Sequence, residues 1–210
     1  MGSSVSRPND HPRLHVEGVV SPFGGPFDLR VDRGECVAVV GRSGSGKSVL
    51  LRLIADLDPH GGEVWLDGRT RSSWSAPRWR RQVIYQAAEP AWWAGTARAH
   101  FSAAVLPVAE MLLSPIGLDA TLLDVDITRL STGERQRMAL VRSLACEPIV
   151  LLLDEPTSAL DQASTLAVEA LLAARIAAGL TVLFVTHSRE QAERVGHRLF
   201  EVREHRVQTA

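Results

Sequence analysis

The stretch CVAVVGRSGSGKSVLLRLIADL, residues 36–57, decides the fold, because an apolar run, a glycine-rich loop and a helical pattern follow one another directly. The run CVAVV is continuous and rich in β-branched residues, as in a strand that is buried on both faces of a parallel sheet. The residues that follow the loop place apolar side chains at helical spacing. The sequence therefore predicts a buried strand, a tight loop and a helix, which is the local unit of an α/β fold.

The loop GRSGSGKS, residues 41–48, fits the pattern G-x-x-x-x-G-K-[ST] of phosphate-binding loops. Its glycines let successive backbone N–H groups face one anion, and the N-terminus of the next helix adds roughly half a positive charge. We expect Lys47 to reach the terminal phosphates of a nucleotide and the Ser48 hydroxyl to bind Mg²⁺. The alternative, a glycine-rich turn that binds nothing, requires neither side chain. The expected nucleotide-binding residues are Gly41, Arg42, Ser43, Gly44, Ser45, Gly46, Lys47, Ser48 and Val49.

A pair of carboxylates follows a second buried-strand pattern in IVLLLDEP, residues 149–156. Open α/β sheets bind ligands at the carboxyl ends of their strands, so we expect Asp154 to hold Mg²⁺, directly or through water. Glu155 would point the other way along the pleat and polarise the attacking water. Alone, an acidic pair after a strand is more often a solvated turn, but the phosphate-binding loop favours the functional interpretation.

Strand and helix patterns alternate along the rest of the chain, which indicates one α/β domain with a mainly parallel sheet. Residues 97–124 are expected to be mostly helical, with breaks at Pro107 and Pro115. The other expected strands are residues 13–20, 26–31, 61–69 and 181–185, and the other expected helices are residues 133–145 and 163–179.

The composition is that of a soluble globular protein, with 45% hydrophobic and 22% charged residues among 210. The balance of 23 Lys plus Arg against 24 Asp plus Glu argues against a nucleic-acid partner. Cys36 and Cys146 lack metal-ligand spacing and are expected to be buried thiols. No apolar run approaches the ~18–20 residues that span a bilayer. The polar residues 1–12 are expected to form a flexible tail ahead of a single domain at residues 13–210.

The segment LSTGERQR, residues 130–137, is the one that discriminates between families. Its Ser131 and Glu134 have the spacing of a capping box, the ordinary start of a helix. The segment also resembles the signature motif of ABC ATPases, usually written LSGGQ, with Thr132 where that family prefers glycine. Downstream, SALD at residues 158–161 resembles the D-loop of the same family, and VTHS places a histidine where its switch histidine lies.

The resemblance extends over about residues 13–200, because the motifs follow the order and spacing of the ABC ATPases. It implies a P-loop NTPase core with a mainly parallel sheet, an N-terminal antiparallel β subdomain and a short inserted helical subdomain at about residues 90–129. It also implies that Glu155 and His187 are catalytic, with His187 contacting the γ-phosphate and orienting both the attacking water and Glu155. The family stacks an aromatic residue on adenine, and we favour Phe23 over Phe27, which should pack in the core.

In this family two domains pack head to tail, and each ATP lies between the phosphate-binding loop of one and the signature helix of the other. The chain carries one set of motifs, so the resemblance implies that it dimerises with a second copy or with a paralogous ATPase. The residues that would contact the nucleotide across this dimer are Ser131, Thr132, Gly133, Glu134 and Asp161.

The resemblance further predicts a Q-loop, whose glutamine senses Mg²⁺ and the attacking water. The family spacing before Pro90 and Thr96 places that glutamine at the position of Ala88. Three outcomes are open: Gln86 replaces it as a metal ligand, Glu89 supplies an oxygen, or the site lacks this ligand. We favour Gln86, because strand alternation keeps it on the same face as Ala88 while the chain is extended.

Trp92 and Trp93 follow this loop, and the sequence leaves open whether they belong to the core or to a docking surface. The expected function is ATP binding and hydrolysis, with ATP and Mg²⁺, that drives transport through integral membrane permease subunits. The protein would lie on the cytoplasmic face of the inner membrane, and the group associated with iron or metal export is the most similar. The alternatives are a soluble ABC ATPase and a P-loop kinase of a small molecule.

Overall fold

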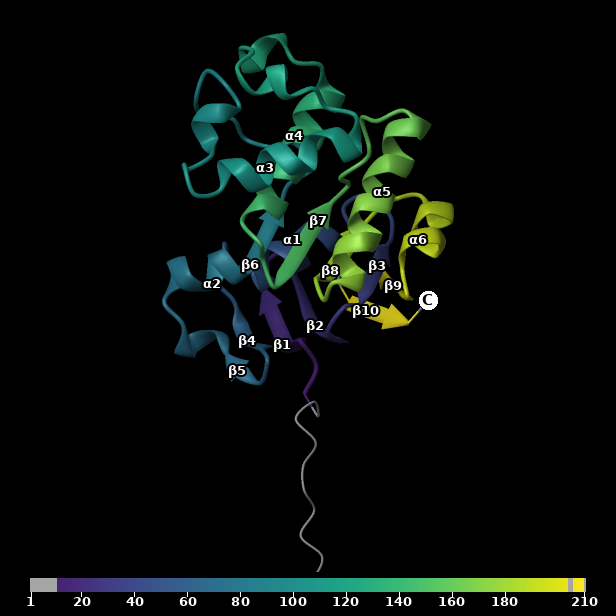
Figure 1. Ribbon diagram of the computed structural model, residues 1–210. Helices are drawn as coiled ribbons and strands as arrows, with labels where there is room; N and C mark the ends of the chain where they lie inside the picture. The colour runs from purple at the N-terminus through teal and green to yellow at the C-terminus, as the bar shows by residue number, and fades with distance from the viewer. Residues whose placement is uncertain (1–10, 204–205, 210) are drawn as a thin grey trace, which may run out of the picture.

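The computed structural model describes residues 11–203 and 206–209, so residues 1–10 of the expected tail lie outside the described part. The described chain forms two β-sheets with helices packed against them (Figure 1). Over these same residues, every helix is too short or too polar to cross a lipid bilayer.

The smaller sheet is antiparallel and is formed by strands from the first third of the chain. Its order is β2–β1–β4–β5, with bounds β1 Leu14–Ser21, β2 Gly24–Val31, β4 Gly61–Leu66 and β5 Arg69–Thr70. Leu14, Val16 and Val19 of β1 are all buried, although 16 and 19 break a strict alternation. A register shift between Val16 and Val19 explains this, because the extra residue of a bulge returns the next apolar side chain to the inner face.

The larger sheet is mainly parallel, as the buried-strand patterns predicted. Its order is β10–β9–β3–β8–β7–β6, and only the β10–β9 pair is antiparallel. Every residue of β3, β7 and β8 is buried. The bounds are β3 Cys36–Val40, β6 Val83–Gln86, β7 Val150–Asp154, β8 Thr181–Val185, β9 Arg198–Arg203 and β10 Arg206–Thr209.

Helices cover both faces of the larger sheet, which separates the two large apolar cores. On one face α1, Lys47–Ile54, packs between the larger sheet and the antiparallel sheet. On the other face α4, Thr132–Ala145, and α5, Gln162–Ala177, pack with α3, Leu106–Leu113 (Figure 1). The α/β architecture with an N-terminal antiparallel sheet and a mainly parallel core sheet is therefore confirmed.

The segment between β6 and α4 differs from the helical expectation for residues 97–124. Its one α-helix is α3, and the rest is irregular chain with short 3₁₀ turns: η2 Arg98–His100, η3 Ser114–Ile116, η4 Ala120–Leu123 and η5 Ile127–Arg129. Pro107 lies in the first turn of α3 rather than breaking a longer helix, as the missing N–H of proline permits there. Pro115 lies two residues after the last residue of α3, within η3, so the helix does end at this proline as expected.

Two short helices were not anticipated: α2, Ala76–Gln82, and α6, Arg189–Val195; the turn η1, Arg71–Ser73, lies just before α2. Each helix is only seven residues long, and α2 buries one large side chain, Trp79, so neither has a full apolar stripe. The expectation of two buried thiols is half wrong, because Cys36 is buried and Cys146 is exposed.

Candidate nucleotide-binding site

The glycine-rich loop joins β3 to α1 in a conformation that requires glycine. Gly44 and Gly46 have φ angles of +76° and +105°, and Gly46 is the left-handed N-cap of α1. A Cβ atom at Gly41 would lie 2.5 Å from the carbonyl oxygen of Val202. The chain can therefore curl tightly ahead of the helix, and the first N–H groups of α1 are left free for an anion.

Lys47 lies at the first position of α1 and folds back over this loop. Its Nζ donates hydrogen bonds to the carbonyl oxygens of Gly41, at 2.7 Å, and Arg42, at 3.1 Å. Gly41 and Arg42 therefore help to orient the ammonium group, although neither lines the cavity beside the loop. The neighbouring residues 43–49 do line it.

The two adjacent carboxylates reach the same cavity from the end of β7. Asp154, the last residue of the strand, is only 6% exposed. Glu155 has a φ of +48°, and its N–H donates to the carbonyl oxygen of Val185 at 3.0 Å. The expectation that Glu155 points the opposite way along the pleat is wrong, because this left-handed turn ends the strand alternation and leaves both carboxylates in the cavity wall.

Glu155 and His187 meet directly. The Oε2 atom of Glu155 lies 2.9 Å from Nδ1 of His187, which follows β8. The Glu155 side chain is 20% exposed and that of His187 is 74% exposed. Both residues line the cavity, so the predicted catalytic pair lies at the mouth of the phosphate-binding loop.

The cavity has a volume of about 520 Å³ and brings together most of the predicted nucleotide-binding and catalytic residues. Phe23 lies at its rim with 71% of its surface exposed, whereas Phe27 is completely buried in the core. Phe23 is thus the aromatic side chain that a base could stack on. The full lining is Phe23, Ser43, Gly44, Ser45, Gly46, Lys47, Ser48, Val49, Ala88, Asp154, Glu155, Ser158 and His187.

Gln86 requires a correction, because it does not line the cavity. It pairs with Leu153 in the parallel sheet, and Leu153 belongs to the core on the α4 and α5 side. Gln86 is 4% exposed, and neither its Oε1 nor its Nε2 has a hydrogen-bond partner among the described residues. The residue at the cavity wall is Ala88, and the exposed Glu89 is not part of the lining either.

Tyr85 is a site residue that the sequence analysis missed. Its side chain lies on the opposite face of β6 from Gln86, and its hydroxyl donates to Oδ2 of Asp154 at 3.1 Å. Burial, and then the neighbouring Asp154 carboxylate, raises the pKa of Tyr85, so the phenol remains a donor. Strand alternation could have identified it, because Tyr85 precedes Gln86 and must therefore face the opposite side of the sheet. Its strand, β6, pairs with β7, the strand that ends in Asp154.

The signature residues lie at the start of α4 and outside this cavity. Ser131 and Glu134 form the expected capping box: the Ser131 Oγ accepts from the Glu134 N–H, and the Glu134 carboxylate accepts from the Ser131 N–H at 2.8 Å. The backbone and then the hydroxyl of Ser131 lower the pKa of Glu134. Thr132 is exposed beside them, so the start of α4 faces solvent.

Gly133 and Asp161 lie at the two ends of the D-loop contacts within the chain: Gly133 packs against the D-loop, and Asp161 caps the helix that follows it. A Cβ atom at Gly133 would lie 3.1 Å from the carbonyl oxygen of Ala159, so only glycine fits comfortably against the D-loop. Asp161 caps α5 by accepting from the Ser164 N–H at 2.7 Å, a bond that lowers the pKa of Asp161. Neither residue lines the cavity of its own chain.

The residues of the cavity fit ATP and Mg²⁺ in their chemistry. The loop offers unpaired N–H groups and a lysine to phosphates. Asp154 makes no ion pair with any described residue although it is almost fully buried, and it shares the cavity with the Ser48 hydroxyl. A hydroxyl and a carboxylate are oxygen ligands of the kind that Mg²⁺ takes beside substrate phosphates.

Comparison with known families agrees with this site. A family model described as "ABC transporter" matches residues 25–158. The chain belongs to the ABC transporter family. Protein STAR1 of Oryza sativa subsp. japonica is 42% identical over 178 residues, covering 80% of this chain and 51% of that protein. The Fe(3+) ions import ATP-binding protein FbpC 2 of Rhodococcus jostii (strain RHA1) is 38% identical over 201 residues, covering 85% of this chain and 56% of that protein.

A solved ABC structure has the same fold. It is the dimeric, post-hydrolysis state of an ATP-binding cassette bound to ADP and Pi, with 25% identity and a TM-score of 0.80. The alignment covers 93% of this chain and 96% of that one. The chain spans about half the length of the first curated relatives that it matches.

Proposed function

We propose that this chain is the ATP-binding and ATP-hydrolysing subunit of an ABC transporter. The observation that carries the proposal is the single cavity in which the phosphate-binding loop, Asp154, Glu155 and His187 meet. A P-loop kinase would need a site for an acceptor molecule. This chain instead has, besides its phosphate-binding loop, a signature motif at the start of α4, which is suited to contact a second domain.

The proposed binding roles follow from the lining of the cavity. The N–H groups at the start of α1 and the Lys47 ammonium bind the phosphates, while Phe23 stacks on the adenine ring. Ser48 and Asp154 hold Mg²⁺. When bound, Mg²⁺ neutralises charge on the phosphate oxygens.

In the proposed reaction Glu155 accepts a proton from the attacking water. The water oxygen then forms a bond to the γ-phosphorus, and the bond from that phosphorus to the β–γ bridging oxygen breaks, releasing ADP and phosphate. His187 holds Glu155 through Nδ1, so its other ring nitrogen is free to contact the γ-phosphate. The pair thereby fixes the direction in which the water attacks.

We further propose that two copies, or this chain and a paralogue, close head to tail over two ATP molecules. The exposed start of α4, with Ser131, Thr132, Gly133 and Glu134, would face the nucleotide of the partner, and Asp161 would lie at the same interface. A helix N-terminus suits a γ-phosphate, because its free N–H groups and its dipole both favour negative charge.

The proposed membrane contact involves residues 90–129, the lobe between β6 and α4. Trp92 packs against the core of this lobe, whereas Trp93 is 74% exposed, and Arg142 lies over both rings at 4.4 and 5.0 Å. An exposed tryptophan beside an arginine is typical of interface anchors. We propose that integral membrane permease subunits cover it on the cytoplasmic face of the membrane; export of iron or another metal remains a prediction.

The test of hydrolysis compares Glu155→Gln with wild type and with Glu89→Gln, an exposed carboxylate outside the cavity. Phosphate release from MgATP without any acceptor substrate should be lost in Glu155→Gln and retained in Glu89→Gln. Light scattering should show Glu155→Gln accumulating as an ATP-dependent dimer. A Glu155→Gln protein that releases phosphate near the wild-type rate would refute the assignment.

The test of the transport role is association with membrane subunits. Affinity purification from detergent-solubilised membranes should recover a multi-spanning membrane protein with the wild-type chain. Trp93→Ala should weaken this association without changing ATP affinity, because Trp93 does not line the nucleotide cavity. Recovery of the chain alone, with unaltered hydrolysis, would favour a soluble ABC ATPase.

A further inference from the structure

The side chain of Gln191 is buried behind the catalytic pair and makes hydrogen bonds with both ends of its amide. It lies on α6 and is 6% exposed. Its Oε1 accepts from the Thr186 hydroxyl at 2.9 Å, and its Nε2 donates to Thr157 Oγ1 at 2.8 Å. Thr157 and Thr186 are themselves 9% and 2% exposed, so these bonds form away from water.

The two threonines are close in sequence to the two predicted catalytic residues. Thr157 is two residues after Glu155, and Thr186 immediately precedes His187. Glu155 and His187 also contact each other at 2.9 Å, so the chain of contacts closes into a ring. Its five members are Glu155, Thr157, Gln191, Thr186 and His187. The ring runs through two backbone segments, which are linked by the Glu155–His187 contact on one side and by the Gln191 amide on the other. The Gln191 amide is the link on the side of the ring that lies away from the cavity.

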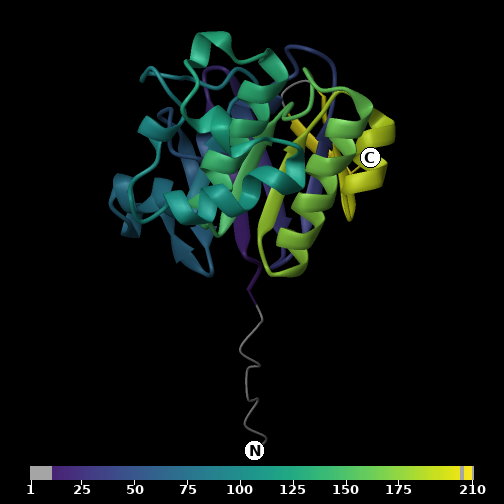
Figure 2. The same cartoon turned by 45° about the horizontal axis from the view of Figure 1, so that its top comes forward.

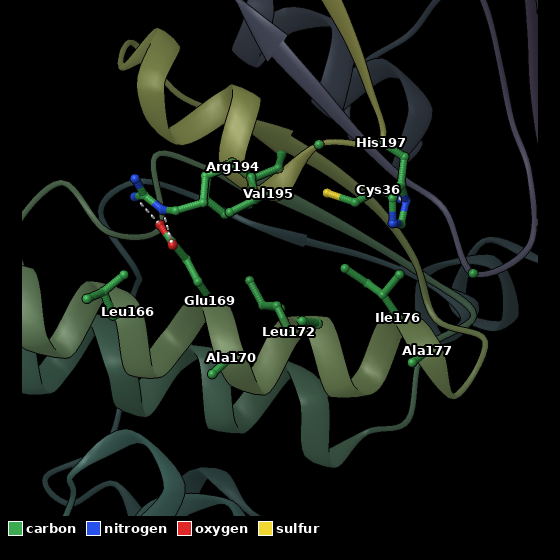
Figure 3. A pocket seen from close by; sticks show the side chains of 14 residues that line it. Cys36, Leu166, Glu169, Ala170, Leu172, Ile176, Ala177, Arg194, Val195 and His197 are labelled. Carbon is green, nitrogen blue, oxygen red and sulfur yellow. Dashed lines mark hydrogen bonds and ion pairs between the residues drawn. The ribbon is translucent and has the colours of Figure 1, made fainter.

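The ring is held from outside by α5. Glu169 of α5 accepts from Gln191 Nε2 at 2.9 Å, and Arg194 grips the same carboxylate with bonds of 2.6 and 2.8 Å. Figure 3 shows Glu169 and Arg194 meeting at one end of a second cavity, of about 480 Å³, which none of the predicted site residues lines. Both ribbon views place α5 and α6 side by side (Figures 1 and 2).

The catalytic pair depends on backbone placement, since packing does little to hold the His187 side chain. The His187 side chain is 74% exposed, so few neighbours restrain it apart from Glu155. Glu155 in turn adopts a left-handed backbone conformation, which a non-glycine residue keeps only when its surroundings enforce it. Hydrogen bonds that fix the backbone segments containing Glu155 and His187 therefore directly affect the distance between these two side chains.

We propose that Gln191 is a positioning residue for ATP hydrolysis, which holds the Glu155 and His187 segments at a fixed separation through Thr157 and Thr186. The inference rests on the proposed function, because Glu155 and His187 must act on ATP for it to matter. The amide is suited to this role, since one group serves a donor hydroxyl and an acceptor hydroxyl at once. An apolar side chain of the same length would leave both hydroxyls buried without this partner.

The first test separates shape from hydrogen bonding. Gln191→Met keeps an unbranched side chain, and Thr157→Val keeps the shape of threonine, but each removes bonds of the ring. We expect kcat for MgATP to fall about tenfold in each variant, with KM changed by less than about twofold, because the phosphate-binding loop and Phe23 are not touched. Thr157→Ser retains the hydroxyl and should restore most of kcat, which a purely structural role would not predict.

Gln208→Met is the matched control, because Gln208 is an exposed amide on β10 outside the cavity. Its kcat and thermal midpoint should equal those of wild type. The proposal is overturned if wild type hydrolyses ATP and Gln191→Met and Thr157→Val both keep the wild-type kcat. It is also overturned if Thr157→Ser loses as much activity as Thr157→Val.

A second measurement does not depend on activity. In Gln191→Met, amide hydrogen exchange in the nucleotide-free protein should become faster in residues 155–159 and 186–191 together, while residues 36–57 keep their wild-type rates. Unchanged exchange in both segments would overturn the proposal. Failure of wild type to release phosphate, alone or with its membrane subunits, would count against the proposed function, and the exchange result would still decide whether the ring exists.

Discussion

Replacing Gln86 by methionine should stabilise the protein. Gln86 is 4% exposed, and both polar atoms of its side chain lack a partner among the described residues. Its neighbour in the sheet, Leu153, belongs to an apolar core, and Ile84 of the same strand as Gln86 packs against that core. Methionine has a similar length and no hydrogen-bonding demand, so it fits where glutamine is penalised.

The size of the effect follows from the cost of an unsatisfied buried polar group, about 1–3 kcal/mol. In a domain of this size each kcal/mol shifts the midpoint of thermal unfolding by about 2–4 °C. The midpoint of Gln86→Met should therefore rise by roughly 2–12 °C. Gln86→Ala should gain less or lose stability, because it also removes buried methylene groups and leaves a cavity.

Thermal unfolding and the Mg²⁺ dependence of ATP hydrolysis should be measured on the same preparations. Gln86→Met should keep the wild-type Mg²⁺ dependence, because Gln86 lies outside the cavity. Gln208→Met, which changes an exposed amide, should leave the midpoint unchanged. A lower midpoint in Gln86→Met, or a need for more Mg²⁺, would show that the buried amide has a partner or reaches the metal, and would refute the prediction.

Four further substitutions test single side chains. Phe23→Ala should weaken ATP binding roughly tenfold with little change in stability, as a titration with a fluorescent nucleotide would show. Phe27→Ala should instead lower the free energy of unfolding by about 3–5 kcal/mol, as measured by urea unfolding. Tyr85→Phe removes a donor to the buried aspartate of the cavity, so half-maximal hydrolysis should need roughly tenfold more Mg²⁺. Ser131→Ala should cost about 1 kcal/mol at pH 7. The Ser131 hydroxyl is the second of two donors that lower the pKa of Glu134 in the folded state. The stability from this bond is present above the ordinary value of 4.5 and lost as pH falls through the lowered pKa. Urea unfolding should therefore show the difference in stability between wild type and Ser131→Ala narrowing in acid.

The parallel core could be predicted because its strands are buried on both faces and must be apolar throughout. β3, β7 and β8 are such strands, and each appears in the sequence as an uninterrupted apolar run. The lobe between β6 and α4 could not be predicted as well, because outside α3 its chain is irregular or forms short 3₁₀ turns, and neither leaves a periodic pattern. Composition rich in alanine and leucine favours helix there without determining it.

The same distinction holds at the site. Residues whose role depends on local backbone, such as Lys47 in its loop and Ser131 at its cap, lie where the motif predicts. The direction of Glu155 was wrong because strand alternation stops at the first residue with a positive φ, and nothing in the sequence marks that turn. Tyr85 was missed because its partner, Asp154, is 69 positions away in the sequence. Gln191 was missed because it joins two residues, of which Thr157 is 34 positions away and Thr186 is 5.

Gln86 shows why counting along a strand is not enough to place a metal ligand. Alternation correctly puts Gln86 and Tyr85 on opposite faces of β6, but it does not say which face meets the nucleotide. The neighbouring strand β7 decides which face meets the nucleotide. Asp154 and Leu152 of β7 lie on the same face of the sheet as Tyr85. Leu153 lies on the other face, together with Gln86. A side chain one pair earlier on the strand can reach the cavity only if the chain leaves its extended course, and β6 remains regular up to its last residue. The wall of the cavity at this point is therefore Ala88, and the donor that does reach the Asp154 carboxylate is Tyr85, the residue beside the expected glutamine.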